Sequence, residues 1–154
     1  PYTPAITLMY GLEEALNMLK EEGLENVFAR HAKLASGVRA AVSAWGLENQ
    51  CREPKYYSNA VTSIRMPEGH SADQFRKLVL ENFNMSLGAG LTKVADKVFR
   101  IGHLGDTNEL TIIGALGGVE MGLEMASVPH QAGGVDAAMA EFRRWTRVDQ
   151  AAAA

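Results

Sequence analysis

The chain has 154 residues, the length of one domain, and 47% of them are hydrophobic, which is enough to build a core. Its net charge of −3 gives neither a basic field for nucleic acid nor an acidic tail, and no apolar run is long enough to span a membrane. The single cysteine, Cys51, excludes a disulfide within the chain and fits a reducing compartment. We therefore expect a cytoplasmic protein with no nucleic-acid or membrane partner.

The two ends of the chain differ from its middle. The first residue is Pro1 rather than methionine, and no signal-type segment follows it, which indicates a piece of a longer polypeptide. Residues 148–154 end in a run of alanines without a packing pattern, so we expect a disordered or artificial tail there. The sequence therefore predicts one domain over residues 1–147.

Two helices are predicted in the first third of the chain. Thr3 suits the N-cap of the first helix, and Pro4 suits its first helical position. Gly23 is a suitable end for this helix, and a second helix follows from Leu24 and ends at Gly46. Apolar residues recur at close to helical spacing in both. They are Ile6, Met9, Tyr10, Leu12, Leu16 and Leu19 in the first helix and Val27, Phe28, Leu34, Val38, Val42 and Trp45 in the second.

Strands and further helices alternate in the rest of the chain. Short apolar or alternating runs predict strands at residues 47–51, 61–66, 85–87 and 98–103. Ser71 with Gln74, and Asp106 with Glu109, have the spacing of capping boxes, and each pair precedes an amphipathic helix. A last helix is predicted over residues 135–145. This order favours an α+β fold, with a small, mostly antiparallel sheet and helices packed on one face.

Several residues that could carry chemistry have a more ordinary interpretation. Gly88 and Gly90 lie in a glycine-rich segment, but no third glycine opens a helix as a dinucleotide-binding loop requires. The histidines lack the spacing of zinc ligands, so we predict no metal site, and His31 is interpreted as a packing residue on an apolar helix face. His103 ends a strand beside glycines, and both an active-site contact and a structural role stay open. Lys93 lies in a polar stretch where its amine stays protonated, which disfavours covalent catalysis.

Arg100 is the strongest candidate for ligand binding. It lies within residues 98–103, a predicted strand whose other members are mostly apolar, where an unpaired guanidinium is costly. Its planar fork suits a carboxylate held by two parallel hydrogen bonds, but an ion pair within the fold would satisfy it equally well. Thr3 also has two possible roles, because the helix start that it caps offers free N–H groups to a phosphate. The residue types alone leave these alternatives open.

Short motifs follow one another in a specific order from Pro1 to about Phe142. They include Pro1-Tyr2-Thr3-Pro4-Ala5, Phe83-Asn84-Met85-Ser86-Leu87-Gly88, and Lys97-Val98-Phe99-Arg100-Ile101-Gly102-His103-Leu104-Gly105. Each motif is short, but together they resemble the C-terminal small domain of the class V aminotransferases, in particular their serine–glyoxylate branch.

This resemblance implies a fold and a reaction. The chain would be the small domain of a fold-type I pyridoxal-phosphate enzyme, a homodimer with its sites at the subunit boundary. The reaction would move the amino group of serine, or of a similar small amino acid, to glyoxylate. The expected partners are then the protein's own large domain, a second subunit, and small amino-acid and keto-acid substrates. The alternatives are alanine–glyoxylate or another small amino-acid transamination, and a non-catalytic domain for dimerisation or anion binding.

The resemblance also assigns residues to the site. Arg100 matches the arginine that binds the substrate carboxylate, and Thr3 matches a threonine that reaches the phosphate of pyridoxal phosphate in the neighbouring subunit. Tyr2, beside Thr3, would line the same pocket. The Schiff-base lysine belongs to the large domain, upstream of Pro1, and no lysine of this chain matches it. We therefore expect no catalytic residue in this chain, and no activity from it alone.

Overall fold

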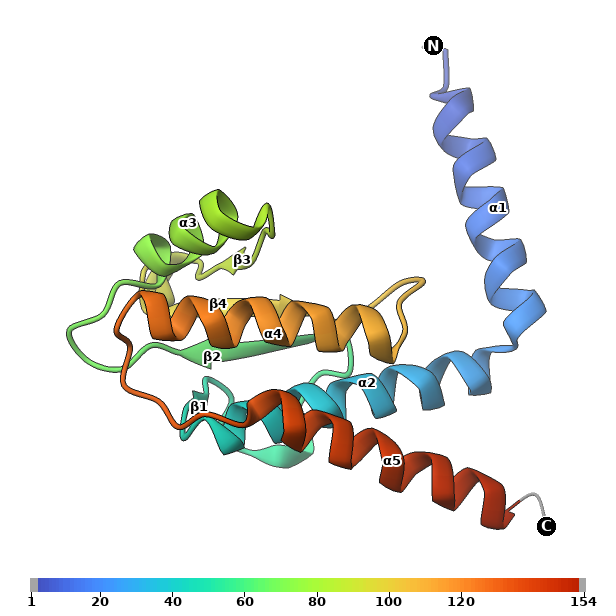
Figure 1. The fold of residues 1–154 in the computed structure, drawn as a ribbon. Coiled ribbons are helices and arrows are strands. Elements are labelled where there is room, and N and C mark those ends of the chain that lie inside the picture. Colours follow the sequence, from blue (N-terminus) through green and yellow to red (C-terminus); the bar gives the residue numbers. More distant parts are fainter. Residues whose placement is uncertain (1–2, 153–154) are drawn as a thin grey trace.

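Residues 3–152, which the computed structural model describes, contain five α-helices and four short strands in the predicted order (Figure 1). The described side chains are those of residues 3–145. The elements are α1 (Ile6–Glu22), α2 (Leu24–Ala44), β1 (Glu48–Asn49), η1 (Pro54–Tyr56), β2 (Val61–Arg65), α3 (Ala72–Phe83), β3 (Gly88–Ala89), η2 (Thr92–Val94), β4 (Val98–Gly102), α4 (Glu109–Met125) and α5 (Gly134–Ala152). The α+β fold expected from the sequence is confirmed.

The strands form one antiparallel sheet in the order β1-β2-β4-β3. Alternate side chains of β2 and β4 separate its two faces. Ile64 and Phe99 are fully buried and belong to the hydrophobic core shared with the helices. Ser63 and Arg100 occupy the alternate positions, so they point to the face that is turned away from this core.

The prediction of a strand at residues 85–87 is wrong, because pairing with β4 begins only at Gly88. The carbonyl oxygen of Leu87 accepts a hydrogen bond from Nε of Arg76 on α3, at 2.8 Å. The Leu87 side chain is buried in the core. Residues 85–87 therefore connect α3 to the sheet and are held by α3 rather than by a neighbouring strand.

The helix N-termini follow the predicted residue types only in part. Ser71 caps α3 as expected, since its Oγ accepts a hydrogen bond from the Gln74 N–H at 3.1 Å. For α4, the prediction of Asp106 as the N-cap is wrong, and Asn108 is the N-cap instead. The extended backbone of Asn108 allows its Oδ1 to accept a hydrogen bond from the N–H of Thr111. A cap therefore depends on where the preceding loop delivers the chain as well as on residue type.

The start of α1 also differs from the prediction. Its N-cap is Ala5, without a side-chain hydrogen bond, and not Thr3. Ala5 has a ψ of 75°, outside the helical range, so the helix cannot begin before Ile6. At the other end of the chain, α5 continues past the predicted end at residue 145 to Ala152. The domain limit at residue 147 stays a prediction.

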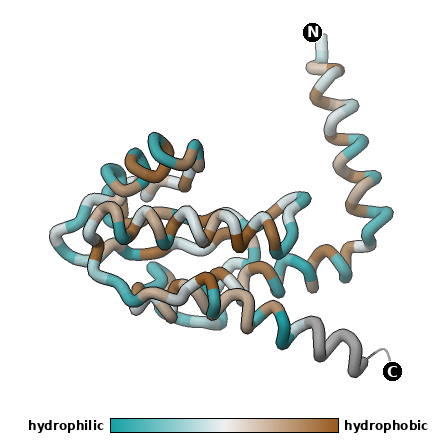
Figure 2. Tube along the Cα trace, viewed as in Figure 1, coloured by the Kyte–Doolittle hydropathy of each residue, from teal (hydrophilic) through white to brown (hydrophobic). Residues whose placement is uncertain are grey.

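α1 projects away from the other elements (Figure 1) and contains no buried residue. Hydrophobic residues recur along its whole length (Figure 2). Its exposed large hydrophobic residues are Ile6, Leu8, Met9, Tyr10, Leu12, Leu16 and Met18. An apolar surface of this extent is typical of an interface, so α1 is suited to being covered by another part of the protein or another subunit. No helix among the described residues is long and apolar enough to cross a bilayer.

Glu120 of α4 forms hydrogen bonds to the end of α2 and to the start of α5. Its Oε2 accepts hydrogen bonds from Nε1 of Trp45 at 3.0 Å and from the Val135 N–H at 3.1 Å, and its Oε1 accepts from the Gly133 N–H at 2.7 Å. Trp45, at the end of α2, is fully buried. Burial by itself would raise the pKa of Glu120, but the hydrogen bonds from Gly133, Trp45 and Val135 outweigh it and hold that pKa below its ordinary value. The carboxylate thus fixes the start of α5 against α2 and α4.

Gly37 allows α2 and α5 to pack closely. A Cβ at this position would lie 2.2 Å from Cε1 of Phe142 on α5, which is closer than atoms can approach. We expect Gly37→Ala to lower the free energy of unfolding by about 1–3 kcal/mol, the usual cost of overpacking a core. Thermal melting would measure this, with Gly114→Ala on α4 as the control because no atom lies within 4 Å of a Cβ there. Equal melting temperatures for the two variants would contradict the prediction.

Candidate functional site

Arg100 lies in the middle of a row of three residues that crosses the sheet. The register of β4 sets it opposite Ser63 of β2 on one side and opposite Gly88 of β3 on the other. Its neighbours Phe99 and Ile101 point into the core, so alternation directs Arg100 to the opposite face. The strand pattern thus presents a partly buried guanidinium on the face that the core does not occupy.

The guanidinium of Arg100 has no counter-charge within the described part of the chain. No carboxylate among the side chains of residues 3–145 lies within ion-pair distance of it. Its Nε is buried and lacks a hydrogen-bond partner there. An unpaired buried charge is costly, so a structure that keeps one commonly supplies the partner as a ligand. The ion pair within the fold, left open as an alternative by the sequence, is not found among these residues.

His103 has a structural role at the end of β4. It is fully buried, and its Nδ1 lies 3.0 Å from the Asn59 carbonyl oxygen, to which it donates. Its Nε2 lies 2.9 Å from the hydroxyl of Thr62 on β2, which donates to it. Burial lowers the pKa of His103, so the ring stays neutral and both nitrogens are satisfied. It therefore fixes the strand that carries Arg100 and leaves no ring nitrogen for a ligand.

The loop that follows β4 is held by two neighbouring residues of α2. Nε2 of His31 accepts a hydrogen bond from the Gly105 N–H at 3.1 Å, and its Nδ1 donates to the Val27 carbonyl oxygen at 2.7 Å. The guanidinium of Arg30 donates to the carbonyl oxygens of Gly105, at 2.8 Å, and Thr107, at 3.1 Å. His31 is thus more than a packing residue, and Arg30 is a contact that residue types alone did not single out.

Arg30 also reaches α1. Its Nε and a terminal nitrogen donate to the two carboxylate oxygens of Glu22 at 2.6 and 2.7 Å. These hydrogen bonds from Arg30 hold the pKa of Glu22 below its ordinary value. One arginine therefore connects the end of α1, the second turn of α2 and the loop beyond Arg100.

The residues predicted to contact the cofactor lie at the start of the chain. Thr3 is exposed and precedes α1, and its side chain makes no hydrogen bond to another described residue. Tyr2 lies outside the described residues. The structure of this chain does not bring Thr3 together with Arg100 (Figure 1).

No lysine of this chain is positioned as a buried nucleophile. Lys33 is half-buried and forms an ion pair with Glu109 at 2.7 Å. The exposed lysines are Lys20, Lys55, Lys77, Lys93 and Lys97. Covalent catalysis by lysine requires a desolvated amine, and an exposed or ion-paired side chain does not provide one. Among the described residues, no three His, Cys, Asp or Glu side chains come together as a metal site would require.

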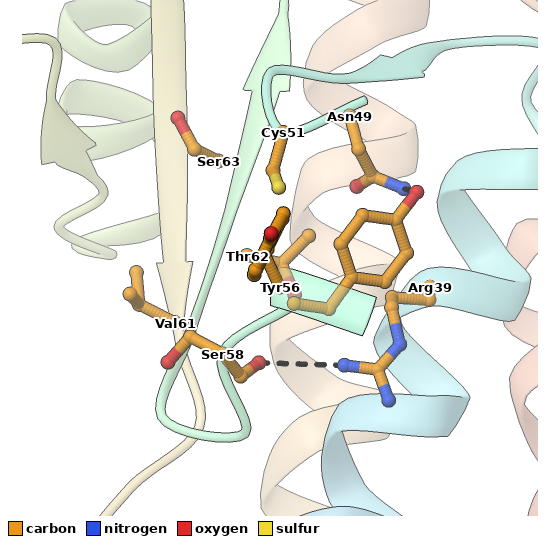
Figure 3. Close-up of a pocket in the computed structure, with 9 residues that line it drawn as sticks. Arg39, Asn49, Cys51, Tyr56, Ser58, Val61, Thr62 and Ser63 are labelled. Carbon is orange, nitrogen blue, oxygen red and sulfur yellow. Dashed lines mark hydrogen bonds between the residues drawn. The ribbon is translucent and has the colours of Figure 1, made fainter. Parts of the chain in front are cut away.

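A small cavity of about 120 Å³ lies beside β2 (Figure 3). Arg39 of α2 stacks on the Tyr57 ring at 5.5 Å and donates to the Ser58 carbonyl oxygen at 3.3 Å. Burial lowers the pKa of Arg39. Oδ1 of Asn49 is buried without a hydrogen-bond partner among the described residues. The residues that line the cavity are Arg39, Asn49, Cys51, Tyr56, Tyr57, Ser58, Val61, Thr62 and Ser63. Ser63 is the member that connects this cavity to the row containing Arg100.

Several known proteins similar to this chain are aminotransferases, although no protein-family model matches it. The serine–glyoxylate aminotransferases of Hyphomicrobium methylovorum and Arabidopsis thaliana are 51% and 50% identical over 92% and 84% of this chain. The L-aspartate–glyoxylate aminotransferase of Paracoccus denitrificans is 45% identical over 100% of it. The chain spans only 35%, 32% and 39% of the lengths of these relatives.

Solved structures agree with these similarities. Pyridoxamine–pyruvate aminotransferase from Mesorhizobium loti matches with a TM-score of 0.88 and 31% identity, over 94% of this chain and 37% of that one. Ureidoglycine–glyoxylate aminotransferase from Bacillus subtilis matches with a TM-score of 0.85 and 27% identity, over 92% of this chain and 37% of that one. The chain therefore matches about a third of the length of these aminotransferases, which is consistent with a C-terminal small domain of the class V family.

Proposed function

We propose that this chain is the substrate-binding small domain of an aminotransferase that moves the amino group of serine to glyoxylate. The observation that carries the proposal is Arg100, a partly buried guanidinium with no counter-charge among the described residues. Its fork suits a carboxylate, the group that serine, glyoxylate and their products share. The serine–glyoxylate aminotransferases among the relatives support serine as the donor.

Pyridoxal phosphate is the cofactor expected of the intact enzyme. When bound, it supplies the electron sink on which transamination depends. This chain's contribution is binding and orientation: Arg100 would hold the substrate carboxylate, Thr3 would reach the cofactor phosphate of a neighbouring subunit, and Tyr2 would line the same pocket. The exposed hydroxyl of Thr3 and the uncovered apolar surface of α1 support contacts with a large domain and with a second copy in a homodimer. A cytoplasmic location stays a prediction.

A donor panel on the full-length protein tests this proposal. Serine, alanine and aspartate would each be offered with glyoxylate, and kcat/KM measured for each pair. We expect the highest value with serine. A higher value with alanine or aspartate would overturn the donor assignment, and the aspartate–glyoxylate relative makes aspartate a necessary member of the panel. A folded, cofactor-loaded protein without transamination would indicate a non-catalytic domain for dimerisation or anion binding.

The isolated chain of 154 residues is expected to form no specific covalent adduct with pyridoxal phosphate. The reason is that its lysines are exposed or, for Lys33, ion-paired with Glu109. Incubation with the cofactor, borohydride reduction and mass spectrometry would measure adduct formation, with the full-length protein as the positive control. A stoichiometric adduct at one lysine of this chain would contradict the prediction.

A further inference from the structure

Gly88 lies directly opposite Arg100, at the start of the short edge strand β3. Glycine is often required where the backbone takes a positive φ, but Gly88 is not among the described residues with a positive φ. An alanine could therefore adopt the same backbone conformation. The reason for a glycine at this position must be sought in the space above it.

That space is occupied by the side chain of Arg100. A Cβ built on Gly88 would lie 3.0 Å from Cβ of Arg100 and 3.2 Å from its Nε. Both distances are shorter than a normal contact between such atoms, so one of the two side chains would have to move. Cβ of Arg100 is fixed by the central strand β4, whereas the guanidinium can rotate about its side-chain torsions. An added methyl group would therefore displace the guanidinium to relieve the contact with Nε, and would shift β3 slightly away from β4 to relieve the contact with Cβ.

The two sides of Arg100 are not equivalent. On the β2 side its neighbour is Ser63, which carries a side chain, and on the β3 side it is the bare backbone of Gly88. The buried Nε of Arg100 lies toward Gly88, as the distance of 3.2 Å shows. The missing side chain on β3 thus leaves the space that the Arg100 side chain occupies on that side.

We propose that Gly88 is a positioning residue for substrate binding, because it leaves the space in which Arg100 is oriented toward a carboxylate. The inference rests on the proposed role of Arg100 in binding the substrate. Gly88 itself makes no contact with the substrate and acts only through the direction of the guanidinium. A small displacement of a group that binds a reactant can cost up to about a hundredfold in rate, so even a single methyl group has a measurable effect.

The test is a double-mutant cycle in the full-length enzyme, with Gly88→Ala and Arg100→Lys made singly and together. We expect Gly88→Ala to raise the KM of both serine and glyoxylate by about tenfold, while absorbance of the bound cofactor is unchanged. In the Arg100→Lys background, Gly88→Ala should alter KM by less than about twofold, because the guanidinium that Gly88 orients is absent. Gly114→Ala, which adds a methyl group where no atom lies within 4 Å, is the control.

The outcomes separate this inference from the proposed function. If Arg100→Lys leaves both KM values unchanged, the proposed carboxylate-binding role fails, and the inference fails with it. If Arg100→Lys weakens both substrates but Gly88→Ala does not, or if the two effects simply add, only the role of Gly88 is overturned.

A folding defect is distinguished by a further variant. Should Gly88→Ala lower the melting temperature, the same change made in an Arg100→Gly background meets neither the Cβ contact at 3.0 Å nor the Nε contact at 3.2 Å. A smaller loss of melting temperature in that background supports the contact between the two residues, and an equal loss overturns it.

Discussion

Arg100→Lys in the full-length enzyme is expected to lower kcat/KM for both serine and glyoxylate by about ten- to a hundredfold. Arginine offers a carboxylate two aligned hydrogen bonds, and lysine, a point donor on a flexible stem, cannot reproduce them. Losing charge-assisted hydrogen bonds costs roughly 1.5–3 kcal/mol, which corresponds to this range of rates. Both substrates should be affected, because each presents its carboxylate to the same residue.

Cofactor binding and stability should respond differently in this variant. The described side chains contain no ion pair to Arg100, so its replacement breaks no ion pair within this part of the chain. We therefore expect a nearly unchanged melting temperature and normal cofactor absorbance. Arg144→Lys on α5, where Arg144 is exposed, is a matched surface control. A folded, cofactor-loaded Arg100→Lys enzyme with normal affinity for both substrates would exclude Arg100 as the residue that binds the carboxylate.

Glu120→Gln is expected to have the largest effect on stability. The carboxylate accepts three hydrogen bonds, from Trp45, Gly133 and Val135, and an amide would replace one accepting oxygen with a donor. At least one of these partly buried N–H groups then loses its acceptor. We expect a loss of about 2–4 kcal/mol of unfolding free energy, since bonds to a charged group are among the stronger ones. For a chain of this size the melting temperature should fall by roughly 4–16 °C.

The effect of Glu120→Gln should depend on pH. The pKa of Glu120 is lower in the folded state than its ordinary value, so its contribution is fully present above the unfolded-state pKa, about 4.3. The contribution is lost as the pH falls through the folded-state pKa. The difference in stability between the original chain and the variant should therefore be full at neutral pH and shrink in acid.

Thermal melting as a function of pH would measure this, with Glu124→Gln, an exposed position one turn further along α4, as the control. A constant difference from neutral to acid pH would contradict the role of the Glu120 carboxylate.

Local patterns were sufficient for the order of the elements and for the choice of Arg100 as the candidate carboxylate-binding residue. Apolar residues spaced three to four positions apart predicted the helices. Arg100 was singled out because it is a charged residue within an otherwise apolar strand. The prediction for the N-cap of α3 was also correct, because Ser71 and Gln74 are neighbours in sequence and the interaction is local. Short strands were harder: β3 has two residues, too few for alternation to be visible.

Long-range contacts decided what local patterns left open. The role of His103 depends on Thr62 and Asn59, which lie 41 and 44 residues away. The choice between Asp106 and Asn108 as the cap of α4 depends on a loop that Arg30 and His31 hold from α2. Both caps are acceptable residue types, so only the position of that loop distinguishes them.

The sequence by itself determined the fold class, the small-domain resemblance and the arginine expected to bind a carboxylate. Only the tertiary structure decided that this arginine lacks a counter-charge among the described residues, and that Gly88 leaves room beside it. The reason is that hydrophobic periodicity and capping are properties of neighbouring residues. A missing ion pair and a free space, in contrast, depend on every segment that the fold brings near Arg100.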